Sequence, residues 1–132
     1  MSEEEELVRA FVVKEKRDRL AELLASPKRR RKATAGLAHF RDLDPRFVVR
    51  LDAREHSPEA VARALRRRGA GSTCHIISEN PELDGKRLSL EFALESVIGH
   101  GAGTLLSCVP GALAYFEGEA PKDRCILSNR AI

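Results

Sequence analysis

The chain has 132 residues, of which 42% are hydrophobic and none is Trp, and its 23 Lys and Arg residues exceed its 20 Asp and Glu residues to give a net charge of +3. This length fits one domain with one core, spanning residues 1–132. No run approaches the roughly 20 apolar residues of a membrane-spanning helix, and the opening Met-Ser-Glu-Glu-Glu-Glu lacks the positive charge of a secretory signal. We therefore expect a soluble, cytoplasmic protein.

The three cysteines, Cys74, Cys108 and Cys125, are an odd number and show no CxxC spacing. A disulfide framework and a zinc knuckle both need cysteines in a different number or arrangement. The sequence therefore predicts reduced, buried thiols that act as small apolar side chains. It predicts neither a metal site nor a cofactor.

Charge is distributed unevenly along the chain. Residues 1–72 hold 18 Lys and Arg against 12 Asp and Glu, a balance of +6, whereas residues 73–132 hold 5 against 8, a balance of −3. A basic half of this kind indicates an anionic partner for the first part of the chain.

An N-terminal helix is predicted over residues 3–25, because the run Glu3–Glu6 lies at the positive end of the helix dipole. Pro27 should end this helix. The cationic run Lys28–Lys32 follows, and five adjacent like charges repel one another. We therefore expect residues 26–36 to form a basic loop or mobile arm.

Residues 37–132 are expected to form a mixed sheet with helices. In their first part, residues 37–56, the pattern is ambiguous, although residues 47–51 are a plausible short strand. The next element is clearer, because Ser57 is a good N-cap and a proline follows it at the first helical position. This pattern predicts a helix over residues 58–68.

Strands are predicted over residues 73–78 and 104–109, with a helix over residues 90–98 between them. Strand, helix, strand in this order is a βαβ unit, whose two strands are parallel. Residues 112–117 and 124–128 should add two antiparallel strands. The predicted fold class is α/β or α+β, with a small mixed sheet that contains one βαβ unit and a C-terminal antiparallel hairpin, packed by two to three helices.

A basic surface is the leading functional feature. On the predicted helix over 58–68, three arginines lie opposite Val61 and Leu65, and they can combine with the cationic run if the two lie close in space. Aromatic residues are few, so we expect any contact with RNA or DNA to depend on backbone charge. A solvated helix face is the simpler explanation of the same arginines. The predicted nucleic-acid-binding residues are Lys28, Arg29, Arg30, Arg31, Lys32, Arg63, Arg66 and Arg67.

A small enzyme or ligand-binding protein is the alternative. In a parallel sheet, ligands lie beyond the carboxyl ends of the strands, which would bring residues 78–80 beside residues 109–111. Ser78, Glu79 and Cys108 would form this rim, with His75 or His100 as the acid or base. The weak catalytic candidates are His75, Glu79, His100 and Cys108. A shared metal on His75 and Glu79 is disfavoured, because residues four apart on a strand are roughly 13 Å apart.

Two further possibilities concern protein partners. The cationic run can contact an acidic protein instead of a nucleic acid, which would make the chain a protein-interaction module. Residues 112–128 can also leave an open sheet edge, at which a second copy would pair to form a homodimer.

Overall fold

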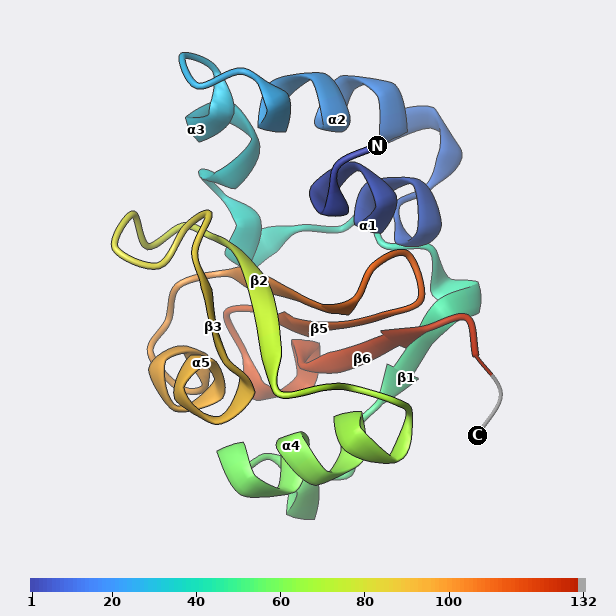
Figure 1. Cartoon of the computed structure of the whole chain (residues 1–132), viewed down its shortest axis with the longest axis vertical. Helices are drawn as coiled ribbons and strands as arrows, with labels where there is room; N and C mark the ends of the chain where they lie inside the picture. The colour runs from blue at the N-terminus through green and yellow to red at the C-terminus, as the bar shows by residue number, and fades with distance from the viewer. Residues whose placement is uncertain (131–132) are drawn as a thin grey trace.

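The computed structural model describes residues 1–130, which form a six-stranded sheet with helices on both faces (Figure 1). The strand order is β1-β6-β5-β4-β2-β3, and every neighbouring pair is antiparallel. The α+β class and the C-terminal hairpin of β5 and β6 are thereby confirmed. The helices are α1 (Glu3–Phe11), α2 (Arg17–Ala25), α3 (Arg30–Thr34), α4 (Pro58–Arg67) and α5 (Leu90–Val97). The strands are β1 (Val48–Arg50), β2 (Thr73–Ser78), β3 (Arg87–Ser89), β4 (Thr104–Val109), β5 (Leu113–Glu117) and β6 (Cys125–Ser128).

The sheet separates two apolar clusters, because successive side chains of a strand point to opposite faces. Ile76 packs in the cluster under α4 and α5, whereas its neighbour Ile77 packs in the cluster under α1 and α2. Tyr115 and Phe116 on β5 divide in the same way. The protein is therefore a three-layer sandwich, with α1, α2 and α3 above the sheet in Figure 1 and α4 and α5 below it.

The predicted parallel βαβ unit is wrong, because β2 and β4 are antiparallel, with Ser78 opposite Thr104. The short strand β3, which the sequence pattern does not reveal, pairs antiparallel with β2 and reverses the chain before α5 begins. Helix α5 then returns the chain to the end at which β2 finished. From there, β4 can only run back alongside β2.

The predicted N-terminal helix is interrupted. Val12 is extended after α1 and bridges to Leu43, because the segment pairs with residues 42–44 instead of continuing the helix. The N–H of Val13 donates to the Asp42 carbonyl oxygen, and the Phe11 carbonyl oxygen accepts from the N–H of Asp44. The predicted basic loop over 26–36 is also corrected, because its centre forms α3. The break after α1 and the formation of α3 both depend on tertiary contacts, which a local sequence pattern does not show.

The outer edges of the sheet are β1 and β3, each three residues long. Strands β5 and β6 lie inside the sheet, so the edge expected within residues 112–128 does not exist. Short edge strands are one way in which proteins discourage pairing with a second copy. Within the described chain, no helix has both the length and the apolar character needed to cross a bilayer.

Candidate functional site

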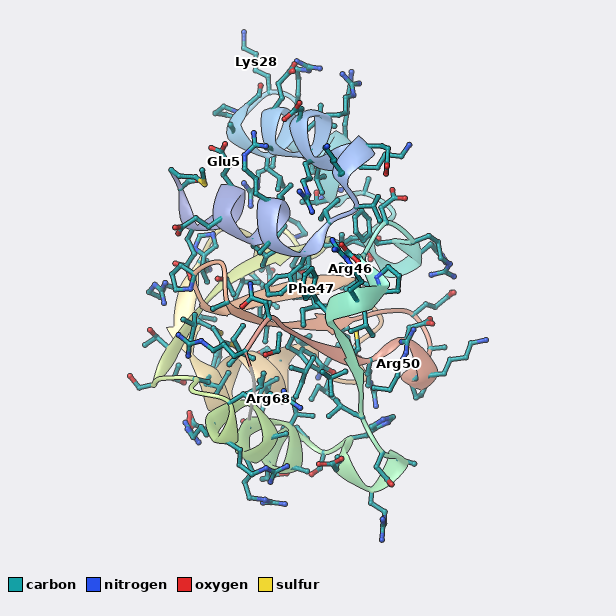
Figure 2. The ribbon with its side chains drawn as sticks, turned by 90° about the vertical axis from the view of Figure 1, so that its right-hand side faces the viewer. Glu5, Lys28, Arg46, Phe47, Arg50 and Arg68 are labelled. Carbon is teal, nitrogen blue, oxygen red and sulfur yellow. The ribbon has the colours of Figure 1, made fainter. Side chains whose placement is uncertain are left out.

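The predicted basic residues lie in two different layers. The run Lys28–Lys32 lies between α2 and α3 and on α3 itself, in the upper helical layer, whereas Arg63, Arg66 and Arg67 lie on α4 in the lower one. Figure 2 shows Lys28 at one end of the molecule and Arg68, just after α4, toward the other. The two groups therefore do not form one compact patch.

Several of these cations already have carboxylate partners. Arg29 lies 2.8 Å from Glu22, and Arg67 lies 3.3 Å from Glu55. Arg66 pairs with Glu91 on the neighbouring helix α5. The guanidinium groups of these three residues therefore carry less free positive charge than the sequence indicates.

Arg30 is part of a partly buried polar network. Its guanidinium group donates to both carboxylate oxygens of Glu4, at 2.7 and 2.6 Å, and to both of Asp84, at 2.9 and 2.7 Å. His75 Nε2 lies 2.6 Å from the Glu4 carboxylate. Burial disfavours the Glu4 carboxylate, but the hydrogen bonds from Arg30 and His75 outweigh burial and lower the pKa of Glu4 to about 2. The network joins α1 and α3 to the sheet, and it occupies His75.

The predicted strand-end rim is not formed. Because β2 and β4 are antiparallel, residues 78–80 lie at one end of the sheet and residues 109–111 at the other. The Glu79 carboxylate instead accepts a hydrogen bond from the backbone N–H of Gly103 at 2.5 Å. Glu79 thus fixes the start of β4, and it does not meet Cys108.

The thiols also lack the properties of nucleophiles. All three are buried, and burial raises the pKa of Cys74 to about 12 and that of Cys125 to about 11. Burial raises the pKa of Cys108 as well. His100 is exposed in a separate open hollow beside Phe92. No cluster of three potential metal ligands occurs among residues 1–130.

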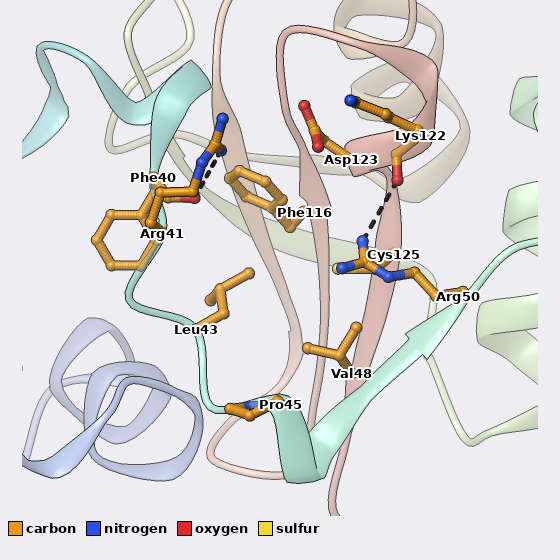
Figure 3. Close-up of a pocket in the computed structure, with 10 residues that line it drawn as sticks. All are labelled: Phe40, Arg41, Leu43, Pro45, Val48, Arg50, Phe116, Lys122, Asp123 and Cys125. Carbon is orange, nitrogen blue, oxygen red and sulfur yellow. Dashed lines mark hydrogen bonds between the residues drawn. The ribbon is translucent and has the colours of Figure 1, made fainter.

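The structure places a different group of cations around a hollow of about 490 Å³, here named the central hollow (Figure 3). Arg41, Arg50 and Lys122 supply positive charge at its sides, and Asp123 is its one acidic residue. The remaining lining residues are Phe40, Leu43, Pro45, Val48, Phe116 and Cys125. An apolar floor with a cationic rim suits an anionic molecule that also has a flat apolar part.

Three separate segments position the rim of the central hollow. Arg41 follows a 3-10 turn, Arg50 ends the edge strand β1, and Lys122 belongs to a second 3-10 turn. Within residues 1–130, the guanidinium groups of Arg41 and Arg50 each donate a single long hydrogen bond, of 3.3 Å, to the carbonyl oxygens of Phe40 and Lys122 respectively. Most of their donors are therefore available to a ligand.

A buried carboxylate supports the turn that carries Lys122. Glu117, only 2% exposed, accepts hydrogen bonds from the Tyr115 hydroxyl at 2.5 Å, from Arg124 Nε at 3.0 Å and from the Gly99 N–H at 3.1 Å. Arg124 directly follows the turn, so its bond to Glu117 fixes the turn against β5. This support holds the end of the turn that carries Lys122.

A second hollow, of about 220 Å³, adjoins the central hollow and shares Phe40 with it. This α2–α3 hollow is lined by Leu20, Leu23 and Leu37, with Lys16, Arg19 and Lys32 as its cations and Asp42 as its acidic residue. None of the six cations of the two hollows forms an ion pair within the described residues. Of the six, sequence reasoning identified only Lys32.

The other five cations were missed for two reasons. Arg41, Arg50 and Lys122 are single charges in separate segments, and Lys16 and Arg19 belong to a run of mixed charge over residues 14–19. The only local signal is a basic residue close to an aromatic one, as in Phe40-Arg41 and in Phe47 three residues before Arg50. Both lie in residues 37–56, where the sequence pattern predicts no firm structure. Only the tertiary fold brings them beside Lys122.

Comparison with known proteins gives no match: no family model, no curated protein and no solved structure is significantly similar to this chain. The function of the two hollows therefore has to be argued from their own residues.

Proposed function

We propose that this protein binds nucleic acid, and that the central hollow and the α2–α3 hollow form its binding surface. One observation carries the proposal: six cations that have no carboxylate partner among residues 1–130 line two hollows that share Phe40. Cations that neutralise phosphates release condensed counterions, which provides most of the affinity for a nucleic-acid backbone.

The apolar floors favour a strand with accessible bases. Phe40 borders both hollows, and Leu43 and Val48 line the central one. Bases of a single strand can contact aromatic and apolar surfaces while their phosphates lie on nearby cations. Once the cations contact phosphates, the remaining lining residues are mostly apolar and offer few groups for reading base edges, so we expect weak sequence preference.

The test measures binding of a fluorescein-labelled 12-nucleotide RNA, and of the DNA of the same sequence, by fluorescence anisotropy. The variant replaces Arg41, Arg50 and Lys122 with Gln and removes three charges from the central hollow. We expect its affinity to fall at least tenfold. The plot of log K against log salt should become shallower by about 2, because each lost single-strand phosphate contact changes the slope by about 0.7.

The matched control replaces Lys28, Arg63 and Lys86 with Gln, which removes the same charge from exposed positions outside the two hollows. We expect a loss of less than threefold, since only the overall field changes. Equal losses in the two triple variants would show that net charge, and not the hollows, drives binding. Unchanged affinity in the central-hollow variant would overturn the proposal.

A further inference from the structure

A third hollow continues the series toward α4. It has a volume of about 130 Å³ and shares Arg50 with the central hollow, and its other cations are Arg67 and Arg68 at the end of α4. The central hollow thus has one lining residue in common with each of the other two, Phe40 with the α2–α3 hollow and Arg50 with the third hollow. We name their cations the basic track, which consists of Lys16, Arg19, Lys32, Arg41, Lys122, Arg50, Arg67 and Arg68.

The track passes from one helical layer to the other around the edge of the sheet. Arg50 is the last residue of β1, and β1 is an outer strand of the sheet. A surface path between the two layers passes either an edge strand or the ends of the strands. Arg50 lies at the end of an edge strand, and its guanidinium lies 3.3 Å from the Lys122 carbonyl oxygen. Figure 2 faces this side of the molecule and labels both Arg50 and Arg68. Arg50 therefore lies between the central hollow and the third hollow.

Charge along the track favours a polyanion. Its eight cations face three acidic lining residues, Asp42, Asp123 and Glu55, so the balance is 8 − 3, or +5. The net charge of the whole chain is +3. Among the described residues, Glu55 alone forms an ion pair with a track cation, at 3.3 Å from Arg67, and that pair is exposed. An exposed pair of this kind contributes little energy and gives way readily to phosphate.

We infer that a single strand of about six or more nucleotides follows the whole basic track, from the α2–α3 hollow to α4. This inference rests on the proposed function and adds the length and course of the ligand. Helices on opposite faces of the sheet are separated by two packing layers of about 10 Å each. At the stacked spacing of about 3.4 Å per nucleotide found along each strand of a duplex, a strand needs roughly six nucleotides to cross about 20 Å.

The course of the track excludes a duplex as the ligand that follows it. Double-stranded DNA stays straight over lengths far below its persistence length of about 50 nm. It would not turn around the end of β1 within a few base pairs at low cost. A flexible single strand bends at each phosphate and can place bases in the hollows.

The experiment compares labelled oligonucleotides of 4 and 12 nucleotides by fluorescence anisotropy. With the unmodified protein, we expect the 12-mer to bind more than tenfold tighter than the 4-mer. The variant Arg67→Gln/Arg68→Gln should lose at least fivefold on the 12-mer and less than twofold on the 4-mer, because the short strand is held by the six cations nearer Phe40. The conservative variant Arg67→Lys/Arg68→Lys keeps both charges and should stay within threefold of the unmodified protein on both lengths.

The control Arg63→Gln/Arg66→Gln removes two charges from the same helix at positions outside the three hollows. If the 67/68 variant and this control behave alike on the 12-mer, the strand does not reach α4, and the inference fails while the proposed function stands. If neither oligonucleotide binds and polyglutamate binds through the same cations, an acidic polypeptide is the partner and both proposals fail. Failure of every polyanion to bind would also overturn both.

Discussion

The ionised carboxylate of Glu4 helps to fix the N-terminal helix to the sheet. Its carboxylate contacts Arg30 and His75, and its pKa is lowered from 4.5 to about 2 in spite of partial burial. A carboxylate with a lowered pKa stabilises the folded state above its unfolded pKa, and this stabilisation is lost as the pH falls toward the folded pKa. We predict that Glu4→Gln lowers the free energy of unfolding by about 2 to 3 kcal/mol at pH 7.

The difference between the two proteins should shrink below pH 4.5 and nearly vanish near pH 2, and urea denaturation at a series of pH values measures it. Glu5→Gln is the control on the same helix, because Glu5 pairs only with the exposed Arg9. An exposed pair of this kind is worth about 0.5 kcal/mol or less. A Glu4→Gln effect that did not depend on pH would contradict the role assigned to this carboxylate.

The environment of Arg30 shows that a local sequence pattern does not identify the long-range partners of a charged residue. The sequence predicted a cation in a basic arm, yet Arg30 binds Asp84, which lies 54 positions away. A run of like charges indicates that the charges need neutralising, but it does not say by which residues. Arg29 and Arg30 found partners within the chain, whereas Lys32 lines the α2–α3 hollow. The charged run therefore predicted that its cations have anionic partners, but the identity of those partners depends on the tertiary structure.

At the scale of elements, local patterns located most helices and strands well. The signals at 58–68, 73–78, 90–98 and 104–109 lie within about one residue of α4, β2, α5 and β4, because caps and apolar runs are local properties. The direction of β4 was wrong because β3, with only three residues, has too short a pattern to recognise. One missed reversal inverts the direction of every later strand relative to β2. Strand direction is therefore less predictable than strand position.

The approach of β4 to the segment before Phe40 provides a test at this scale. A Cβ atom on Gly103 would lie 2.0 Å from the backbone nitrogen of Ala38, so an alanine there forces two backbones apart. We predict that Gly103→Ala lowers the free energy of unfolding by at least about 2 kcal/mol, as severe overpacking does. It should also weaken nucleic-acid binding, because the displaced segment carries Phe40 and Arg41. Urea denaturation and anisotropy measure the two effects.

Gly71→Ala is the matched control, because no atom lies within 4 Å of its added Cβ and its backbone does not require glycine. Replacing such a glycine restricts the unfolded chain and is expected to stabilise by up to about 1 kcal/mol. If Gly103→Ala were as stable as Gly71→Ala, the close packing of β4 against this segment would be disproved.

At the scale of the whole molecule, the candidate site forms only when separate segments of the folded chain come together. The central hollow takes Arg41, Arg50 and Lys122 from segments that no shared motif connects. A periodic pattern can place a residue on a face of its own element, but it does not specify which elements lie side by side. The sequence therefore predicted an anionic partner, but of the contact residues proposed here it named only Lys32 and Arg67. Sites of this kind become visible only when the sheet order is known.

The two apolar clusters also couple the unfolding of the two helical layers, because both clusters are built on the same strands. Strands β2, β4, β5 and β6 contribute side chains to both clusters, so neither helical layer can lose its cluster without exposing the sheet. We predict that Leu7→Ala, above the sheet, and Leu65→Ala, below it, each shift one common transition by about 2 to 5 kcal/mol. Far-UV circular dichroism reports on all helices, and the fluorescence of Tyr115, the only tyrosine, reports on the lower cluster.

In Leu7→Ala, the substitution and the reporter Tyr115 lie on opposite faces of the sheet, which makes this variant the decisive one. Coincident curves from the two probes are the signature of two-state unfolding. Phe92→Ala, at a side chain that is 56% exposed, should shift the same transition by less than about 1 kcal/mol. Loss of helical signal in Leu7→Ala before the Tyr115 signal changes would show that the upper layer unfolds independently. The basic track crosses both layers, so independent unfolding of the upper layer would remove the α2–α3 hollow while leaving α4 in place.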